Sequence, residues 1–277
     1  MSGLSGAAGV RQRVPKSYLF VPGNRPDRFT KAVDSGAHVL ILDLEDAVGP
    51  DDKDAARRSV FLWLADGGDA IVRINGADTP WHADDLAAVA NWGRAAVMVP
   101  KADAGLMARM AEALPGRPLV GLVETVAGLI DLLDVAQTRG VARLAFGNID
   151  FGADARLPED SPALNHVRFD ISIASRHADL PPPIDGVTTA LDDAAILDAD
   201  VARAKAFGFV AKLCIHPRQV AAVNAGFAPT ALEIQWSHDV VDAISASGGA
   251  VAQVGGKMVD RPMLARAEAI LADEGDA

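Results

Sequence analysis

The chain has 277 residues, of which 50% are hydrophobic and 23% charged, and its formal net charge is −11. That length suits one barrel-type domain or two smaller domains, and the composition is that of a globular protein. The acidic balance argues against a nucleic-acid-binding protein, because a polyanion is bound by a basic surface. No run of the sequence approaches the roughly 20 apolar residues of a membrane span. We therefore expect neither a nucleic acid nor a membrane as a partner.

The only cysteine, Cys214, lies in an apolar run, so no disulfide can form within the chain. A reducing compartment and a buried, unreactive thiol are the expectations that follow. Residues 1–13 lack an apolar stretch of the kind found in signal peptides. We expect a cytoplasmic protein whose residues 1–16 form a flexible N-terminal segment.

Short apolar runs alternate along the chain with longer segments whose apolar residues recur every three or four positions. Most of the runs are apolar throughout, as is typical of parallel strands covered on both faces. Eight such strands alternating with helices predict a closed (β/α)8, or TIM, barrel of the α/β class. An open doubly wound sheet is the alternative, but its G-x-G-x-x-G turn is replaced here by VPGNRPDRF. The expected strands are 18–22, 39–44, 70–75, 95–100, 118–124, 142–147, 184–188 and 209–216.

The seventh of these strands, PPPIDGVTT, is the least regular and follows an unusually long segment. Beyond the eighth strand the chain continues further than a barrel needs, with a glycine-rich break, SGGAVAQVGGK, before its last helix. We expect residues 17–228 to form the barrel and residues 229–277 a C-terminal helical extension that acts as a lid or contacts another subunit. The additional helices expected are 164–178, 217–226, 230–245 and 261–272.

Polar side chains follow six of the expected strands, at the edge where (β/α)8 barrels place their active sites. Any single one is explained as well by a cap on the following helix. Convergence from six strands is harder to explain in that way. The residues are Asp43, Glu45, Asp46, Arg73, Asn75, Lys101, Glu124, Gly147, Asn148, Asp150 and His216.

Five of these side chains are carboxylates, which repel one another unless a cation lies among them. Oxygen ligands favour a hard ion, and Mg²⁺ takes one or two carboxylates together with water and substrate. No Cys/His spacing supports zinc. We expect Glu124 and Asp150 to bind the metal, and the acids after the second strand to hold its water ligands. The alternative is that Asp43 and Asp46 only cap the turn before Asp51.

Arg73 lies between apolar residues in IVRIN, so its charge needs a partner. A guanidinium suits a substrate carboxylate, and an ion pair with an acid after the second strand is the alternative. Lys101 could neutralise the acids or orient Glu45. For His216, which precedes a proline that begins a helix, capping or packing is at least as well supported as catalysis.

Seven longer motifs follow one another along the chain. They are YLFVPGNRPDRFTKA, LILDLEDAVGPDDKDAAR, VRING, VPKAD, GLVET, AFGNIDFGAD and KLCIHPRQV. Their order resembles that of citrate lyase β-subunit-like (CitE-like) proteins of the HpcH/HpaI aldolase/citrate lyase family. The resemblance extends from Ser17 to the end and includes NAGFAPTALEI and GKMVDRP. It departs from the family at Gly255 or Gly256, where a polar residue is usual, and at DGVTT, where many relatives carry a tyrosine and further acids.

The resemblance implies a barrel that binds Mg²⁺ through Glu124 and Asp150. It further implies that Arg73 holds a keto-acid carboxylate and that Glu45 and Asp46 contact metal-bound water. In the related malyl-CoA and citramalyl-CoA lyases, the aspartate that matches Asp260 reaches the site of an adjacent subunit and acts there as acid or base. Similar proteins form trimers or hexamers, so a homo-oligomer is expected here.

The activity implied is that of a carbon–carbon lyase. It would cleave or form a 3-hydroxy-acid CoA thioester such as malyl-CoA, citramalyl-CoA or citryl-CoA, with acetyl-CoA and a 2-keto acid as the other partners. We expect backbone amides at Gly147 and Asn148 to help Arg73 fix the carboxylate, and Arg25 and Arg28 to attract the CoA phosphates. The alternatives are the β subunit of a citrate lyase complex acting on an acyl-carrier-protein thioester, an aldolase acting on free hydroxy-keto acids, and a thioester hydrolase.

Overall fold

The computed structural model describes residues 14–91 and 95–274, which divide into two compact units. Of these residues, the larger unit takes those from Pro15 to Phe227, and the smaller takes Val14 and those from Ala228 onward. Residues 1–13 of the expected flexible segment lie outside the described residues. Lys16 is already tied to the barrel, because its N–H donates to His38 Nδ1 at 3.0 Å and its C=O accepts from Lys212 N at 2.8 Å.

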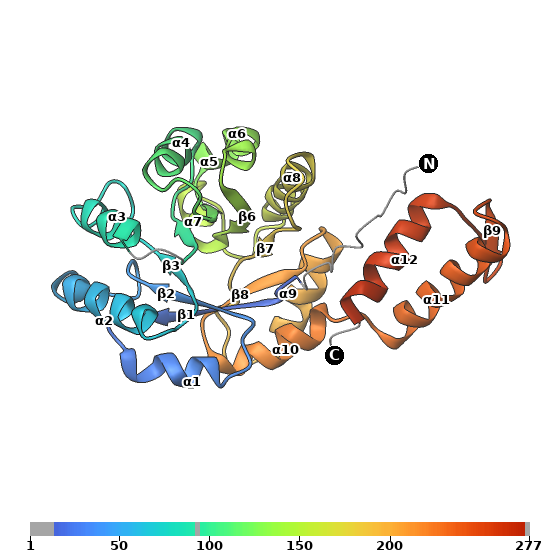
Figure 1. Ribbon diagram of the computed structural model, residues 1–277, viewed down its shortest axis with the longest axis horizontal. Coiled ribbons are helices and arrows are strands. Elements are labelled where there is room, and N and C mark those ends of the chain that lie inside the picture. Colours follow the sequence, from blue (N-terminus) through green and yellow to red (C-terminus); the bar gives the residue numbers. More distant parts are fainter. Residues whose placement is uncertain (1–13, 92–94, 275–277) are drawn as a thin grey trace, which may run out of the picture. The chain divides into compact units, whose positions relative to one another are not determined.

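The larger unit is a closed barrel of eight parallel strands in sequential order, which confirms the predicted (β/α)8 architecture (Figure 1). The last strand closes onto the first, with Ser17 opposite Lys212. The seventh strand has only two residues, in keeping with its irregular sequence. The strands are β1 (Ser17–Pro22), β2 (Val39–Asp43), β3 (Ile71–Arg73), β4 (Val97–Val99), β5 (Leu119–Val123), β6 (Val141–Phe146), β7 (Ile184–Asp185) and β8 (Ala211–Cys214).

The helices surround the barrel, and one apolar cluster fills its interior while a larger cluster lies between strands and helices. Because both faces of the strands are buried, their sequences are apolar without alternation. The extra helix expected over 164–178 is α8. The helical elements are η1 (Pro26–Arg28), α1 (Phe29–Val33), η2 (Pro50–Asp52), α2 (Lys53–Ala65), α3 (His82–Asn91), α4 (Ala104–Ala113), α5 (Val126–Ile130), α6 (Leu132–Gln137), α7 (Asn148–Asp154), α8 (Leu164–His177), α9 (Ala194–Ala206) and α10 (Pro217–Phe227).

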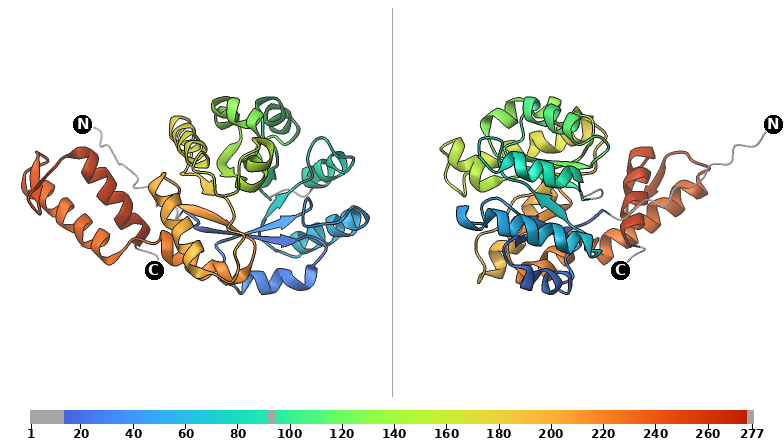
Figure 2. Two further views of the ribbon diagram at one scale, coloured as in Figure 1. Left: turned by 180° about the vertical axis from the view of Figure 1, so that it is seen from behind. Right: turned by 60° about the vertical axis from the view of Figure 1, so that its left-hand side comes forward.

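The smaller unit is a pair of helices, α11 (Ala231–Ala246) and α12 (Arg261–Glu274), which lie side by side (Figure 2). Between them, the stretch that the sequence suggested to be a break forms an antiparallel hairpin of β9 (Ala252–Val254) and β10 (Lys257–Val259). Its turn is Gly255–Gly256, with φ of 55° and 78°. Tight hairpin turns with two such residues favour glycine, so the glycines join strands here and do not interrupt structure.

Within the described part of the chain, every helix is too short or too polar to cross a membrane.

A buried group of three charged side chains holds the short strand β7 in the barrel. Asp185 accepts from Arg168 Nε of α8 at 2.8 Å and lies 3.2 Å from Lys212 Nζ of β8. Lys212 also donates to Gly186 O at 2.6 Å. Burial opposes ionisation of Asp185, but the two cations outweigh it and lower its pKa. Side-chain contacts thus supplement a strand that is paired with β6 only through Ala145 and Ile184.

We expect Asp185→Asn to lower the free energy of unfolding by about 3–5 kcal/mol, because two buried cations lose their counter-charge. Equilibrium urea unfolding followed by circular dichroism measures the change. The matched control is Asp179→Asn, whose exposed carboxylate lies 3.8 Å from Arg176 Nη1. That control should change stability by less than about 0.5 kcal/mol. Equal stability of the two variants would show that the buried group does not hold β7.

Candidate metal and substrate site

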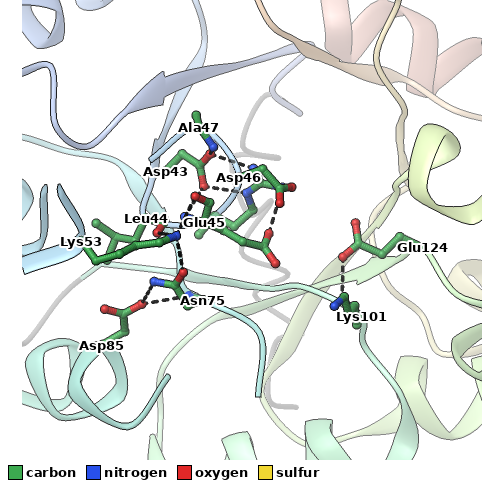
Figure 3. A network of polar contacts seen from close by, with 11 residues as sticks. Asp43, Leu44, Glu45, Asp46, Ala47, Lys53, Asn75, Asp85, Lys101 and Glu124 are labelled. Carbon is green, nitrogen blue, oxygen red and sulfur yellow. Dashed lines mark hydrogen bonds and ion pairs between the residues drawn. The ribbon is translucent and has the colours of Figure 1, made fainter. Parts of the chain in front are cut away.

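Four carboxylates and one guanidinium gather at the C-terminal ends of neighbouring strands. Glu45 and Asp46 follow β2, and Glu124 follows β5 directly. Asp150 lies in the first turn of α7, just beyond β6. Figure 3 shows Glu124 across from the group that follows β2. The structure therefore brings together the acids that the sequence placed at one edge.

Arg73, the last residue of β3, is held mainly by Asp43, the last residue of β2. Its Nε and Nη2 donate to the two Asp43 oxygens, both at 2.7 Å. Its Nη1 donates to Asp46 at 3.2 Å and lies 3.1 Å from Glu45 Oε2. In the structure, Arg73 therefore pairs with the acids at and after the end of the second strand, which the sequence analysis gave as the alternative to a substrate carboxylate. Only the Nη1 side of the guanidinium faces the remaining carboxylates.

The Asp43 carboxylate stabilises the loop after β2 and does not face the accessible side of the site. Besides binding Arg73, its carboxylate accepts from Glu45 N at 2.9 Å and from Ala47 N at 3.0 Å. This is the turn-capping role that was the alternative for Asp43. Asp46 is different, because its side chain is 68% exposed and remains accessible to water and ligands.

Glu45 is buried next to other carboxylates. Its Oε2 has no hydrogen-bond partner among the described residues, although Arg73 lies nearby. The pKa of Glu45 is raised to about 8, mainly by burial, which Arg73 opposes and the charges of Asp46 and Glu124 reinforce. The charge of Arg73 alone is therefore too small to keep the Glu45 carboxyl group ionised at neutral pH, and a further cation nearby would favour its ionised form.

Glu124 is buried and oriented by the backbone. Its Oε1 accepts from Lys101 N at 2.8 Å, and Lys101 has a φ of 48°, which is unusual for a residue with a side chain. Its Oε2 lies against Gly147, where an added Cβ would come within 2.6 Å of it. The pKa of Glu124 is raised to about 7, mainly by burial, which the Lys101 N–H opposes and the charges of Asp150 and Asp46 reinforce.

Asp150 is exposed at the rim and takes part in the same repulsion. Partial shielding from water raises its pKa first, and the charge of Asp46 raises it further. Glu45, Asp46, Glu124 and Asp150 are thus linked by mutual repulsion, which a cation among them would relieve. No three His, Cys, Asp or Glu side chains in the described ranges form a ready-made metal site. Two carboxylates completed by water are within the usual ligation of Mg²⁺.

The structure corrects the expectation for the Gly147 N–H, at the end of β6. The Gly147 N–H donates to Val123 O at 3.0 Å, so it is committed to the barrel and is not free for a substrate carboxylate. Both polar atoms of the Asn148 side chain bind the backbone of Val187, at 2.8 and 3.2 Å. At the end of β4, Lys101 Nζ pairs with Asp78 at 3.1 Å and the Lys101 N–H orients Glu124, while the Lys101 charge also interacts with Glu45 and Glu124, as expected if it neutralises the acids.

The remaining predicted residues lie in other parts of the chain. His216 Nδ1 accepts from Arg218 N at 3.1 Å, which is the capping role considered for it. Arg25 pairs with Asp27 at 2.9 Å, and Arg28 is exposed at the end of η1. Asp260, in the smaller unit, immediately precedes α12, and its carboxylate accepts from Met263 N at 3.4 Å.

Sequence reasoning missed Lys53, which lies beneath the loop after β2. Its Nζ donates to Leu44 O and Glu45 O, both at 2.8 Å, and to Asn75 Oδ1 at 2.5 Å (Figure 3). Asn75 is bound in turn by Asp85. A signal was present, since Lys53 and Arg57 are four positions apart in DDKDAARR and thus share one face of a helix.

A cavity of about 720 Å³ lies between α8, α9 and the loop after β7. Its walls include Arg168, Thr188, Asp200 and Arg203. Of the predicted site residues, only Asn148 lines it, so this cavity is separate from the carboxylates that repel one another.

The profile of the HpcH/HpaI aldolase/citrate lyase family matches residues 16–217. The citrate lyase subunit beta-like protein of Mycobacterium tuberculosis is 34% identical over 268 residues, covering 94% of this chain and 96% of that protein. The (3S)-malyl-CoA thioesterase of Cereibacter sphaeroides is 33% identical over 274 residues, covering 93% and 96%. A crystal structure of CitE from M. tuberculosis with magnesium, acetoacetate and coenzyme A aligns with a TM-score of 0.82 and 32% identity, covering 96% of this chain and 100% of the other.

The raised pKa values of Glu45 and Glu124 predict how stability depends on pH when divalent ions are removed with EDTA. From about pH 4.5 to about pH 8, the folded protein keeps protons that the unfolded chain has released. The free energy of unfolding should therefore fall as pH rises, by about 1.4 kcal/mol per pH unit for each proton of difference. Urea unfolding at several pH values measures the slope. Glu45→Gln should make it shallower, and an unchanged slope would contradict the assignment.

Proposed function

The chain belongs to the HpcH/HpaI aldolase/citrate lyase family, and from that premise we propose that it is a Mg²⁺-dependent carbon–carbon lyase. Its substrate would be a 3-hydroxy-acid CoA thioester such as malyl-CoA, citramalyl-CoA or citryl-CoA, split into acetyl-CoA and a 2-keto acid. The observation that carries the proposal is the group of mutually repelling carboxylates beside Arg73 at the C-terminal end of the barrel.

Glu124 and Asp150 would hold the ion, while Glu45 and Asp46 would bind its water ligands. The fit is supported by Glu45 Oε2, which is buried without a hydrogen-bond partner among the described residues, and by the two raised pKa values. Bound there, Mg²⁺ would act as a Lewis acid that stabilises negative charge developing on a substrate oxygen. The magnesium in the mycobacterial CitE structure supports the choice of metal.

Arg73 would orient the keto-acid carboxylate through Nη1, the nitrogen that Asp43 does not hold. An incoming carboxylate would compete there with Asp46 and Glu45, which would instead bind the metal-bound water. The Asn148 N–H, at the start of α7, is the backbone donor that would assist, in place of Gly147. Fixing both partners in this way lowers the entropic part of the barrier.

Proton transfer to and from the acetyl-CoA carbon would be carried out by Asp260 of a neighbouring subunit in a homotrimer or hexamer. Arg25 and Arg28 would attract the CoA phosphates. A second candidate, hydrolysis of the thioester, is favoured by the similarity to a (3S)-malyl-CoA thioesterase. An acyl-carrier-protein thioester is the third candidate substrate, in view of the citrate lyase subunit beta-like relative.

Incubating the protein with Mg²⁺, acetyl-CoA and either glyoxylate, pyruvate or oxaloacetate tests the lyase directly. Mass spectrometry should find a 3-hydroxyacyl-CoA product with one of the keto acids, and EDTA should prevent its formation. Free CoA together with the hydroxy acid would indicate the hydrolase. No product with any keto acid would refute a lyase acting on these CoA substrates and favour a carrier-protein substrate or an aldolase of free acids.

Replacing one proposed metal ligand should abolish both metal binding and activity. We expect Glu124→Gln to lower kcat/KM by more than about 100-fold, because a neutral amide is a poor ligand for a hard cation. Titration calorimetry with Mg²⁺ gives the second readout. The control is Glu112→Gln, an exposed glutamate on α4 that should leave both quantities unchanged. Full Mg²⁺ affinity in Glu124→Gln would refute the ligand assignment.

Mixed oligomers test whether Asp260 acts in the site of another subunit. Asp260→Asn and Glu124→Gln should each be inactive alone, since one lacks the acid and the other lacks the metal. After equal amounts of the two variants are unfolded together and refolded, activity should return to about a quarter of wild type, because one site in four combines an intact Glu124 with an intact neighbouring Asp260. No recovery, with oligomers of normal size, would place Asp260 in its own subunit's site or outside catalysis.

A further inference from the structure

The backbone of Glu45 is clamped at both ends by buried charged groups of opposite sign. Its N–H donates to the Asp43 carboxylate at 2.9 Å, and its C=O accepts from the Lys53 ammonium at 2.8 Å. Both charged side chains are nearly inaccessible to solvent, Asp43 at 0% and Lys53 at 6%. Hydrogen bonds to charged groups are stronger than neutral ones. The direction in which the Glu45 side chain leaves the loop is therefore set by two strong contacts.

Lys53 has no capacity left for a ligand. An ammonium has three N–H groups, and here they are directed at Leu44 O, Glu45 O and Asn75 Oδ1. Trp81 covers the group, with Nζ 5.0 Å from its ring centre. Burial lowers the pKa of Lys53, while Asp43, Glu45 and Asp85 raise it. Lys53 thus acts on the loop it holds and not on a bound molecule.

The third acceptor, Asn75, is itself fixed by neighbouring helices. Its N–H and Nδ2 donate to Asp85 Oδ2 at 2.9 and 2.6 Å, and Asp85 Oδ1 accepts from Arg57 Nε at 2.7 Å. Arg57 lies one turn after Lys53 on α2, and Asp85 is on α3. The loop after β2 is therefore braced by α2 directly and by α3 through Asn75.

We propose that Lys53 is a positioning residue. It fixes the positions from which Glu45 and Asp46 contact the metal-bound water and Nη1 of Arg73. This inference rests on the proposed lyase function, because it assigns those acids to the metal. Without the ammonium, the C=O groups of Leu44 and Glu45 lose their buried donor and the loop turns to satisfy them elsewhere. Glu45 and Asp46 then leave the positions from which they act on the ion and on Arg73.

The test compares Lys53→Met, which keeps the length without the charge, with Lys53→Arg, which keeps a charged donor. Circular dichroism and size-exclusion chromatography check folding, calorimetry gives the Mg²⁺ Kd, and the keto-acid assay gives kcat and KM separately. For Lys53→Met we expect a folded protein with a Kd for Mg²⁺ about 10–100-fold higher and a lower kcat at saturating Mg²⁺. Lys53→Arg should recover part of both. Lys31→Met, exposed on α1, is the matched control and should match wild type.

Normal Mg²⁺ affinity and kcat in a folded Lys53→Met protein would overturn the proposal, even if that protein were less stable. Should Lys53→Met not fold, Asn75→Ala replaces it, because it removes one of the three acceptors and leaves the charge in place. That variant should raise the Kd in the same direction by a smaller factor, and an unchanged Kd would overturn the proposal. A wild-type protein without Mg²⁺-dependent product would instead refute the proposed function, so the two failures are distinct.

Discussion

Four carboxylates at one end of the barrel must stay within reach of one another, although neighbouring negative charges help to raise the pKa values of Glu45, Glu124 and Asp150. Most of the contacts that hold the acids in place involve the backbone of the loops that carry them, or come from it. Asp43 and Lys53 hold the loop after β2, and the Lys101 peptide holds Glu124. Arg73 compensates part of the charge, but two of its nitrogens are used by Asp43. The site thus holds several acidic groups in place, two of which have raised pKa values that a bound divalent cation would lower.

Much of the fold was predictable because its signals are local. Continuous apolar runs between amphipathic segments reflect strands covered on both faces, and this pattern identified all eight strands of the barrel. Even the two-residue β7 was visible as an irregular run. The ion pair between Asp185 and Lys212 was not predictable from the sequence. A polar residue within an apolar strand does not identify its partner, and Arg168, which also pairs with Asp185, lies on a helix distant in the sequence. The hairpin after α11 was missed for a different reason, since glycines mark both chain breaks and tight turns.

The candidate site was predictable in its membership more than in its contacts. Carboxylates that end parallel strands must lie at one edge, so Glu124 and Asp150 could be placed near the β2 loop from strand order alone. Which donors and acceptors of the site already have hydrogen-bond partners depends on distances of a few ångströms, and residue spacing in the sequence does not give these. The Gly147 N–H is an example, since it completes a ladder to Val123. Lys53 is another, because a lysine at the start of an amphipathic helix is ordinarily assigned to solvent.

The orientation of Glu124 depends on a peptide group, since the atom that holds it is the backbone nitrogen of Lys101. What position 101 must supply is a left-handed backbone, with φ of 48°, while its ammonium points to an exposed aspartate. Residues that adopt this conformation easily, such as glycine or asparagine, would serve as well as lysine. A survey that replaces side chains one at a time would therefore pass over one of the contacts on which the site is built. In this chain, a substitution at position 101 keeps the contact with Glu124 as long as it keeps the left-handed conformation of the backbone.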